Sequence, residues 1–365
     1  MRARHAERIE RAARAAEQAE LVALLVPPSP DLAYLIGYDP MPLERPTTLI
    51  LRPDAVPVLV VPALERPLAA GSPMGSELDL VAWRDGEDPY AVIAGLLPTQ
   101  GRVGIGERLW ANHLLELQRL RPQLGFLAST TVSGGLRAVK DVEELGALRR
   151  AGRAADATFD EIVTRPFTGR TERSIAEELA ALLVRHGHAE ADFTIVASGP
   201  HGASPHHEPG TRVIERGDAV VLDFGGRLDG YFSDTSRTVV VGDPPPGFAE
   251  VYDLVAHAQQ AAVAAVRPGV TARSIDRAAR DVIAAGDRAD GFVHRTGHGI
   301  GLEVHEPPWI VEGNELALAA GMTFSVEPGV YLDGRFGVRI EDIVAVTDDG
   351  VERLNLSTRQ LQVVD

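Results

Sequence analysis

Residues 218–241 read DAVVLDFGGRLDGYFSDTSRTVVV, and this stretch decides the fold expected for the second half of the chain. Two apolar runs flank Asp229-Gly230, a dipeptide typical of a tight hairpin turn. If that dipeptide forms the loop, Asp223 lies opposite Ser236. Because side chains alternate along a strand, Asp234 then shares a face with Asp223, at a separation that suits a shared metal ion. The alternative is a pair of solvated turn residues, since Asp is common in turns.

A second stretch repeats this pattern of strand, Asp-Gly turn and strand. Residues 321–346 read GMTFSVEPGVYLDGRFGVRIEDIVAV, with Glu327 and Glu341 where the first stretch has its two Asp residues. A two-residue loop would turn the two Glu side chains to opposite faces of the hairpin. Both reach one site only if the loop has an odd number of residues or the ladder has a bulge, for which Gly337 is the expected place.

A glycine-rich segment precedes the second hairpin. Residues 296–308 read TGHGIGLEVHEPP, without the Gly-Lys-Ser/Thr of a phosphate-binding loop, so a nucleotide site is not favoured. Since the chain has no Cys, any metal must be held by oxygen and imidazole. His298 and four carboxylates suit a pair of divalent ions, with Mn²⁺ favoured and Co²⁺ or Zn²⁺ as alternatives.

The two halves of this region also begin alike. Arg-Pro precedes Thr171-Glu172-Arg173-Ser174-Ile175 in one half and Thr271-Ala272-Arg273-Ser274-Ile275 in the other. Each Thr is expected to cap the helix that follows it, because its hydroxyl accepts from exposed N–H groups of the first turn. A repeat of about 100 residues predicts two half-domains related by a pseudo-twofold axis, with a site between them.

The first part of the chain predicts a separate α/β domain. A charged helical segment is followed by short apolar runs, bounded by Pro, that alternate with helical patterns. We expect an N-terminal domain over residues 1–128, a linker over 129–140 and a catalytic domain over 141–365.

Composition excludes several classes of protein. Apolar residues make up 45% and charged residues 24% of the 365 residues, which is typical of a globular protein. The formal charge of −16, without a basic run, argues against a nucleic-acid partner. The sequence has no apolar stretch of membrane-spanning length and no secretory or transit pattern at its start, so we expect a cytoplasmic protein without a membrane partner.

The sequence resembles the creatinase, aminopeptidase P and prolidase branch of the "pita-bread" metallopeptidases. The motifs quoted above carry the resemblance, together with residues 29–38 (SPDLAYLIGY), which are typical of a creatinase-type N-terminal domain. The resemblance implies an α/β N-terminal domain followed by an α+β pita-bread catalytic domain with an internal pseudo-twofold duplication. It also implies a homodimer, because the N-terminal domain in this family often covers the partner's site.

The resemblance assigns five metal ligands by position. Asp223 and Asp234 correspond to the ligands of a first ion, and His298 and Glu327 to those of a second. Glu341 and Asp234 correspond to residues that bridge the two ions.

The resemblance assigns the catalytic set to four residues. Glu327 corresponds to the general base, and His206 and His305 to histidines that donate hydrogen bonds to the developing oxyanion. Arg339 corresponds to the arginine that supports the metal ligands, and alternation places it on the strand face of Glu341.

Three further residues are expected beside the substrate. His294 matches a histidine of the aminopeptidase P type, and Tyr231 matches an aromatic residue behind the ligands. Trp309 stands where many prolidases carry an Arg that binds the free carboxylate of a dipeptide. An indole cannot make that contact, so we lean toward longer peptides unless another Arg supplies it.

The function implied is hydrolysis, with two divalent metal ions, of the Xaa-Pro bond at the N-terminus of dipeptides or short proline-containing peptides. The first alternative is a non-peptidase relative on the same scaffold, an amidinohydrolase or lyase of creatinase type. The second is a binding module that has lost catalysis. Five intact ligand positions argue against creatinase itself and against the inactive module, whereas metal-dependent lyases and amide hydrolases stay open.

Overall fold

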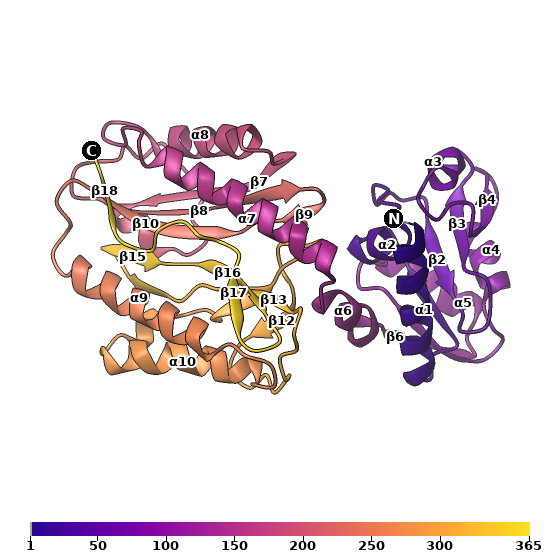
Figure 1. Cartoon of the computed structure of the whole chain (residues 1–365). Helices are drawn as coiled ribbons and strands as arrows, with labels where there is room; N and C mark the ends of the chain where they lie inside the picture. The colour runs from indigo at the N-terminus through magenta and orange to yellow at the C-terminus, as the bar shows by residue number, and fades with distance from the viewer. Residues whose placement is uncertain (1) are drawn as a thin grey trace. The chain divides into compact units, whose positions relative to one another are not determined.

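The computed structural model describes residues 2–365 and divides the chain into two compact units that meet between Arg137 and Ala138 (Figure 1). That boundary falls inside the segment 129–140, most of which forms helix α6 (Thr130–Ala138). No helix within residues 2–365 is long and apolar enough to cross a membrane. Each unit is described by itself below.

The first unit is built on a six-stranded mixed sheet in the order β4-β3-β2-β1-β5-β6. Its strands are β1 (Ala23–Val26), β2 (Thr48–Leu51), β3 (Val58–Pro62), β4 (Asp79–Trp83), β5 (Gly101–Ile105) and β6 (Leu124–Ala128). Its helices before α6 are α1 (Arg2–Gln18), α2 (Pro30–Ile36), α3 (Arg66–Ala70), α4 (Pro89–Leu96) and α5 (Ala111–Leu120). In α2 the hydroxyl of Ser29 accepts from Leu32 N, and Gly37, at a φ of 68°, ends the helix, so its bounds follow directly from the sequence.

The second unit contains two five-stranded sheets and a small hairpin. The first sheet has the order β18-β10-β8-β7, with β9 also paired to β8: β7 (Glu190–Ser198), β8 (Ala219–Leu228), β9 (Tyr231–Phe232), β10 (Thr235–Val241) and β18 (Gln362–Val364). The second has the order β12-β11-β13-β16-β17: β11 (Gly297–Gly299), β12 (Glu306–Ile310), β13 (Thr323–Val326), β16 (Asp342–Val346) and β17 (Val351–Arg353). The hairpin pairs β14 (Gly329–Leu332) with β15 (Phe336–Arg339).

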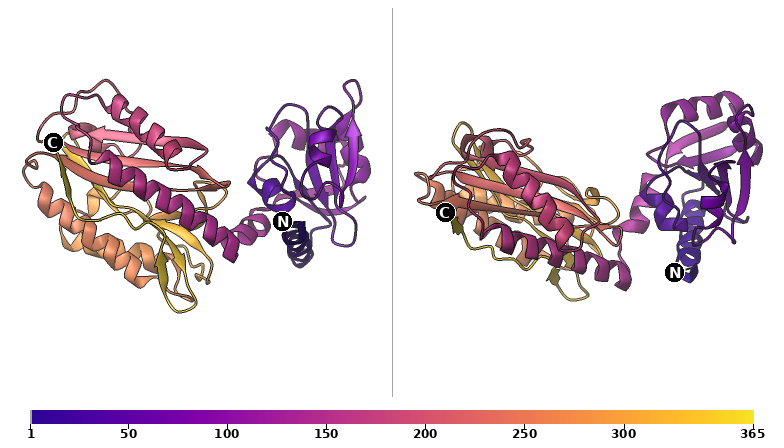
Figure 2. Two further views of the ribbon diagram at one scale, coloured as in Figure 1. Left: turned by 45° about the horizontal axis from the view of Figure 1, so that its top comes forward. Right: turned by 90° about the horizontal axis from the view of Figure 1, so that it is seen from above.

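A pair of helices covers the outer face of each sheet, so that the sheets lie between two helical layers (Figures 1 and 2). The pairs are α7 (Val142–Ile162) with α8 (Glu172–Arg185), and α9 (Phe248–Ala265) with α10 (Ala272–Ala285). Phe159 of α7 packs in one core with Leu222 of β8, and Val255 of α9 packs in the other with Phe324 of β13. This is the duplicated α+β architecture that the repeated pattern predicts.

The first hairpin has the predicted register. Leu228 pairs with Tyr231, and Asp223 faces Ser236. Asp229 and Gly230 have φ angles of 53° and 83°, the left-handed conformation that both central residues of this turn type require.

The second hairpin has an odd loop, as predicted, but the extra residue is not at Gly337. Leu332 pairs with Phe336, which leaves a loop of three residues, and the same register continues to the pair Val326 and Asp342. Gly337 pairs regularly with Tyr331. Its lack of a side chain serves a different purpose, because a Cβ there would lie 1.9 Å from the carbonyl oxygen of Gly202.

The two expected helix caps differ. Ser174 N donates to Thr171 Oγ1 at 3.2 Å, which confirms the first cap. The second cap was wrong: the Thr271 hydroxyl lies 2.6 Å from the Ser274 hydroxyl and makes no capping bond to the backbone. Both Thr residues nevertheless form an isolated antiparallel bridge to a later segment. The backbone of the two halves is therefore alike at this position, although the side-chain contacts differ.

Candidate metal centre

A cavity of about 720 Å³ in the second unit collects most of the predicted site residues. Its size suits a small substrate. The predicted residues that line it are His206, Asp223, Asp234, His294, His298, His305, Glu327, Arg339 and Glu341. All five expected metal ligands therefore face one space, although they come from β8, from β11, from the turn before β10 and from the segments that flank the β14–β15 hairpin.

The acidic side chains converge on His298. Its Nε2 lies 3.2 Å from Glu327 Oε1 and 3.5 Å from Asp234 Oδ2. Asp234, His298 and Glu341 each offer a ligand atom, and these atoms lie within 4.8 Å of one another. This spacing lets the three residues hold a common cation.

The His298 ring is oriented for metal binding. Its Nδ1 lies 3.1 Å from the carbonyl oxygen of Gly299, which can only accept, so Nδ1 donates there and Nε2 points to the acids. Without metal, a proton on Nε2 bonds Glu327, and a bound ion would take the place of that proton. Gly297 allows the close approach of β11 to β13, because a Cβ at that position would lie 1.8 Å from the carbonyl oxygen of Ser325.

The surroundings of two carboxyl groups make ionisation unfavourable in the absence of a metal ion. Burial raises the pKa of Asp234 well above its usual value, and the negative charges of Asp223 and Glu327 raise it further. Burial and the neighbouring Asp234 raise the pKa of Glu341 in the same way. A cation between these groups would remove the repulsion.

Two buried carboxylate oxygens also need a partner. Among residues 2–365, no hydrogen-bond donor reaches Asp223 Oδ1 or Glu341 Oε1. A buried polar atom without a partner is costly, and a metal ion supplies one. The donor set of four carboxylates and one imidazole therefore fits divalent cations.

Arg339 contacts one of the acids directly and a second one through Ser236. Its guanidinium contacts Asp223 Oδ2 at 2.5 Å, and its Nε donates to Ser236 Oγ at 2.8 Å. Ser236 Oγ in turn donates to Glu341 Oε2 at 2.8 Å. Because these contacts use one oxygen of each carboxylate, the other oxygen stays directed to the cavity.

The aromatic residue beside Arg339 is Tyr331, and the expectation for Tyr231 was wrong. Arg339 donates to the Tyr331 hydroxyl at 2.8 Å, and His294 Nε2 lies 2.9 Å from that hydroxyl. Tyr231 instead donates to Glu144 at 2.8 Å, within an apolar cluster away from the cavity. The register would have revealed Tyr331, since a three-residue loop places it diagonally from Arg339 on one face of the hairpin.

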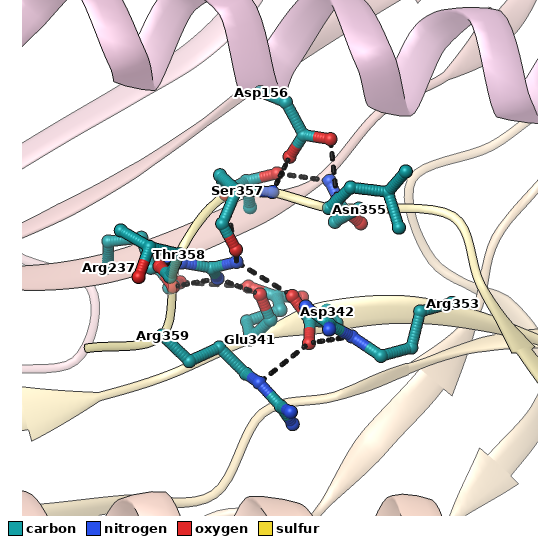
Figure 3. Close-up of polar contacts among 12 residues, drawn as sticks. Asp156, Arg237, Glu341, Asp342, Arg353, Asn355, Ser357, Thr358 and Arg359 are labelled. Atoms are coloured by element: carbon teal, nitrogen blue, oxygen red, sulfur yellow. Dashed lines mark hydrogen bonds and ion pairs between the residues drawn. The ribbon is translucent and has the colours of Figure 1, made fainter.

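A polar network behind the cavity fixes the strand that begins after Glu341 (Figure 3). Arg237, almost fully buried, contacts Asp342 at 2.8 Å and donates to the Glu341 carbonyl oxygen. Arg353 contacts the second oxygen of Asp342 at 2.8 Å. The network fixes the backbone at Glu341, so the direction of that side chain does not depend on the metal alone.

The comparisons with known proteins agree with this geometry. Residues 146–348 match the family described as Metallopeptidase family M24, and residues 8–139 match the Creatinase/Prolidase N-terminal domain. The chain belongs to metallopeptidase family M24.

Individual M24 relatives align along most of their length. A Mycobacterium tuberculosis protein named "Probable dipeptidase PepE" is 45% identical over 348 residues, which is 94% of this chain and 92% of that protein. The Xaa-Pro dipeptidase of Lactobacillus helveticus is 37% identical over 91% of this chain and 92% of that protein. The crystal structure of dipeptidase PepE from Mycobacterium ulcerans superposes with a TM-score of 0.95 at 45% identity, covering 100% of this chain and 98% of that one.

These matches establish the fold and favour one class of activity. The second unit of this M24 chain has the pita-bread fold, and the first is its creatinase-type partner. A peptidase is therefore favoured over the amidinohydrolase or lyase alternative.

A buried ion pair lies next to His305 in this M24 chain. Lys140 Nζ donates to Glu306 Oε1 at 2.7 Å, and both side chains are 1% exposed. Because Glu306 follows His305 directly, the pair fixes the strand at the residue after the cavity histidine.

A buried carboxylate holds the loop that carries His206. Glu172 Oε1 accepts from Ser198 N at 2.9 Å and from its hydroxyl at 2.7 Å, and Glu172 Oε2 accepts from Gly210 N at 3.2 Å. Burial alone raises the pKa of Glu172, but hydrogen bonds from Ser198, His207 and Gly210 outweigh it and lower that pKa to about 2.

We expect Glu172→Gln to lower the free energy of unfolding by about 3 kcal/mol at pH 7, since a pKa lowered from 4.5 to about 2 corresponds to roughly that difference. A lowered carboxyl pKa stabilises the fold only while the group is ionised. The contribution is therefore complete above about pH 4.5 and is lost as the pH falls toward 2. Urea unfolding of the wild type and of Glu172→Gln between pH 7 and pH 3 measures this contribution. If the difference in their free energies of unfolding did not become smaller as the pH falls, the prediction would be contradicted.

Proposed function

We propose that this metallopeptidase hydrolyses the Xaa-Pro bond of short peptides, with dipeptides preferred, by means of two divalent ions. One ion is assigned to Asp223 and Asp234 and the other to His298 and Glu327, with Asp234 and Glu341 bridging. The observation that carries the proposal is the convergence of these five side chains in one cavity, two of them with a buried oxygen that lacks a donor among residues 2–365. The Xaa-Pro dipeptidases among the relatives support the choice of bond.

The ions, when bound, supply a water of lowered pKa and polarise the scissile carbonyl. Glu327 is assigned the proton transfer: its carboxylate takes the proton of the attacking water and delivers it to the proline nitrogen as the C–N bond breaks. Burial raises the pKa of Glu327, but hydrogen bonding and charge from His298 outweigh burial and lower that pKa to about 2. Glu327 is therefore ionised at neutral pH, as a proton acceptor must be.

The histidines of the cavity wall are assigned to the substrate. His206 and His305 are exposed to the open cavity, where an N–H can donate to the carbonyl oxygen as that oxygen gains negative charge. The His305 ring stands nearly perpendicular to His298, with 4.1 Å between the ring centroids. His294 is held by the Tyr331 hydroxyl and is assigned to the same substrate wall.

Arg295 supports the preference for dipeptides. Trp309 itself does not line the cavity, but the Arg295 guanidinium, which does, lies 4.5 Å over the Trp309 ring. Among residues 2–365 no carboxylate lies within ion-pair distance of Arg295, and burial lowers its pKa. A half-buried guanidinium without an anionic partner suits the free carboxylate of a bound dipeptide, so Arg295 replaces the Arg that is missing at position 309.

We expect Arg295→Met to lower kcat/KM for Ala-Pro by about 10- to 100-fold, mainly through KM, because a charge-assisted contact contributes roughly 1.5–3 kcal/mol. For Ala-Pro-Ala, whose carboxylate lies one residue further along, the loss should stay under about threefold. Arg295→Lys is the matched control and should retain part of the dipeptide activity. Equal losses for both peptides would contradict the assignment.

The proposed activity is tested by proline release from Ala-Pro, with Ala-Ala as the control dipeptide. The protein loaded with Mn²⁺ should release proline from Ala-Pro and cleave Ala-Ala at least about tenfold more slowly in kcat/KM. Equal rates would contradict the Xaa-Pro specificity. Mn²⁺ as the native ion, a homodimeric assembly and a cytoplasmic location are parts of this proposal that rest on the sequence and its family resemblance.

A further inference from the structure

A second cluster of metal-ligating side chains lies outside the cavity. His201 Nδ1 is 3.0 Å from Glu172 Oε1, and His207 Nε2 is 2.9 Å from Glu172 Oε2. The two imidazole rings are 4.3 Å apart, and the three residues offer ligand atoms that all lie within 4.8 Å of one another. None of the three lines the cavity of the dinuclear centre.

The loop that carries His206 is anchored to Glu172 by backbone groups, without help from His201 or His207. Ser198 and Gly210 already anchor the loop to Glu172 through backbone N–H groups. His201 and His207 converge on the same carboxylate in addition, with 4.3 Å between their ring centroids. Two imidazoles and one carboxylate form a donor set typical of zinc sites in proteins.

Accessibility and charge also suit a cation. The side chains of His201 and His207 are 42% and 18% exposed, whereas Glu172 is fully buried, so an ion can arrive from solvent and keep a water ligand. The nearby guanidinium of Arg212 is bound to both oxygens of Asp218, at 2.6 and 2.9 Å, and makes no ion pair with Glu172.

We propose that Glu172, His201 and His207 form a third metal site, separate from the dinuclear centre, for one divalent ion of borderline softness such as Zn²⁺. The ion takes the lone pairs of His201 Nδ1 and His207 Nε2 and one of Glu172. Each imidazole keeps its proton, which moves to its other ring nitrogen, while the contacts from Ser198 and Gly210 remain. Because His206 precedes His207 directly and faces the cavity, occupancy fixes the segment that carries His206.

The test is zinc binding measured by equilibrium dialysis with metal analysis. The proteins are the wild type, His201→Asn/His207→Asn, and the control His186→Asn, which removes another His–Glu pair at 3.1 Å. We expect the wild type and the control to bind one more Zn²⁺ per chain than the double variant. The same difference is expected in an Asp234→Asn background, where the dinuclear centre is broken. The zinc measurement therefore tests the third site whether or not the proposed peptidase activity is correct.

A single substitution keeps the third site testable if the double variant does not fold. His201→Gln changes only the most exposed ligand and should weaken the third zinc by at least about tenfold, since even residues behind the ligands contribute that much to metal affinity. Zinc should also slow hydrogen exchange over residues 199–210 in the wild type but not in His201→Gln. Equal zinc stoichiometry in the wild type and a folded double variant, or unchanged affinity in His201→Gln, would overturn the proposal.

Discussion

Glu341→Gln is expected to lower kcat/KM for Ala-Pro by at least about 10³-fold, roughly 4 kcal/mol of transition-state stabilisation, while making the metal-free protein more stable. Activity falls because the amide cannot bridge two cations as a carboxylate does. Stability rises because one of several crowded negative charges in a buried cluster is removed. Proline release and urea unfolding in the presence of a chelator measure the two effects.

The pH dependence of the free energy of unfolding shows whether Glu341→Gln acts by removing a crowded charge or by disturbing the structure in general. Burial and the charge of Asp234 raise the pKa of Glu341 above its usual 4.5, so the folded protein binds the proton more tightly than the unfolded chain. The free energy of unfolding of the metal-free wild type should therefore fall as the pH rises above 4.5. That of metal-free Glu341→Gln should fall less over the same range, because the amide does not titrate. Glu315→Gln, at a largely exposed ion pair with Arg273, is the control and should change neither property. A metal-free Glu341→Gln protein less stable than wild type at pH 7 would contradict the account.

Glu327→Gln should lower kcat for Ala-Pro by at least about 10³-fold, with a smaller change in KM. The amide keeps the shape of the side chain and can retain the contact with Ser325, whose hydroxyl donates to Glu327 Oε1 at 2.9 Å. It cannot accept the proton of the attacking water, and it is a weaker metal ligand. Stopped assays at saturating peptide and metal give kcat directly.

The matched control for Glu327 is Ser325→Ala. It removes a hydroxyl that donates to Glu327 Oε1 and accepts from His298 N, both at 2.9 Å, and leaves the carboxylate itself in place. The loss of these two hydrogen bonds should cost about 10- to 100-fold in kcat/KM. If Glu327→Gln retained more than a tenth of the wild-type kcat at saturating metal, another residue would have to be the proton acceptor.

The sequence predicted the elements that local rules determine. Asp229-Gly230 fixed the first hairpin, because that turn demands two residues in the left-handed conformation. Parity required either an odd loop or a bulge before Glu341, and the structure has the odd loop. Gly337 was misplaced because its role depends on the backbone of Gly202, far away in the chain. No local pattern contains that contact.

The parts of the site that escaped prediction depend on contacts between distant segments. Tyr331 escapes sequence reasoning because the three-residue loop that places it beside Arg339 follows only from the register of the hairpin. Arg295 escapes sequence reasoning because its stacking on Trp309 joins the segment before β11 to β12, a contact that no local pattern contains. The Glu172 cluster draws its ligands from a helix start and a later loop, about 30 residues apart, a separation too large for any motif based on helical or strand periodicity.

The most direct test of the central claim is a crystal structure of the Mn²⁺-soaked protein with anomalous scattering data. We expect two manganese peaks about 3.5–4 Å apart, with Asp223, Asp234, His298, Glu327 and Glu341 all within bonding distance of one or both. A single peak, or two peaks that leave any of these five side chains uncoordinated in a protein that releases proline from Ala-Pro, would contradict it.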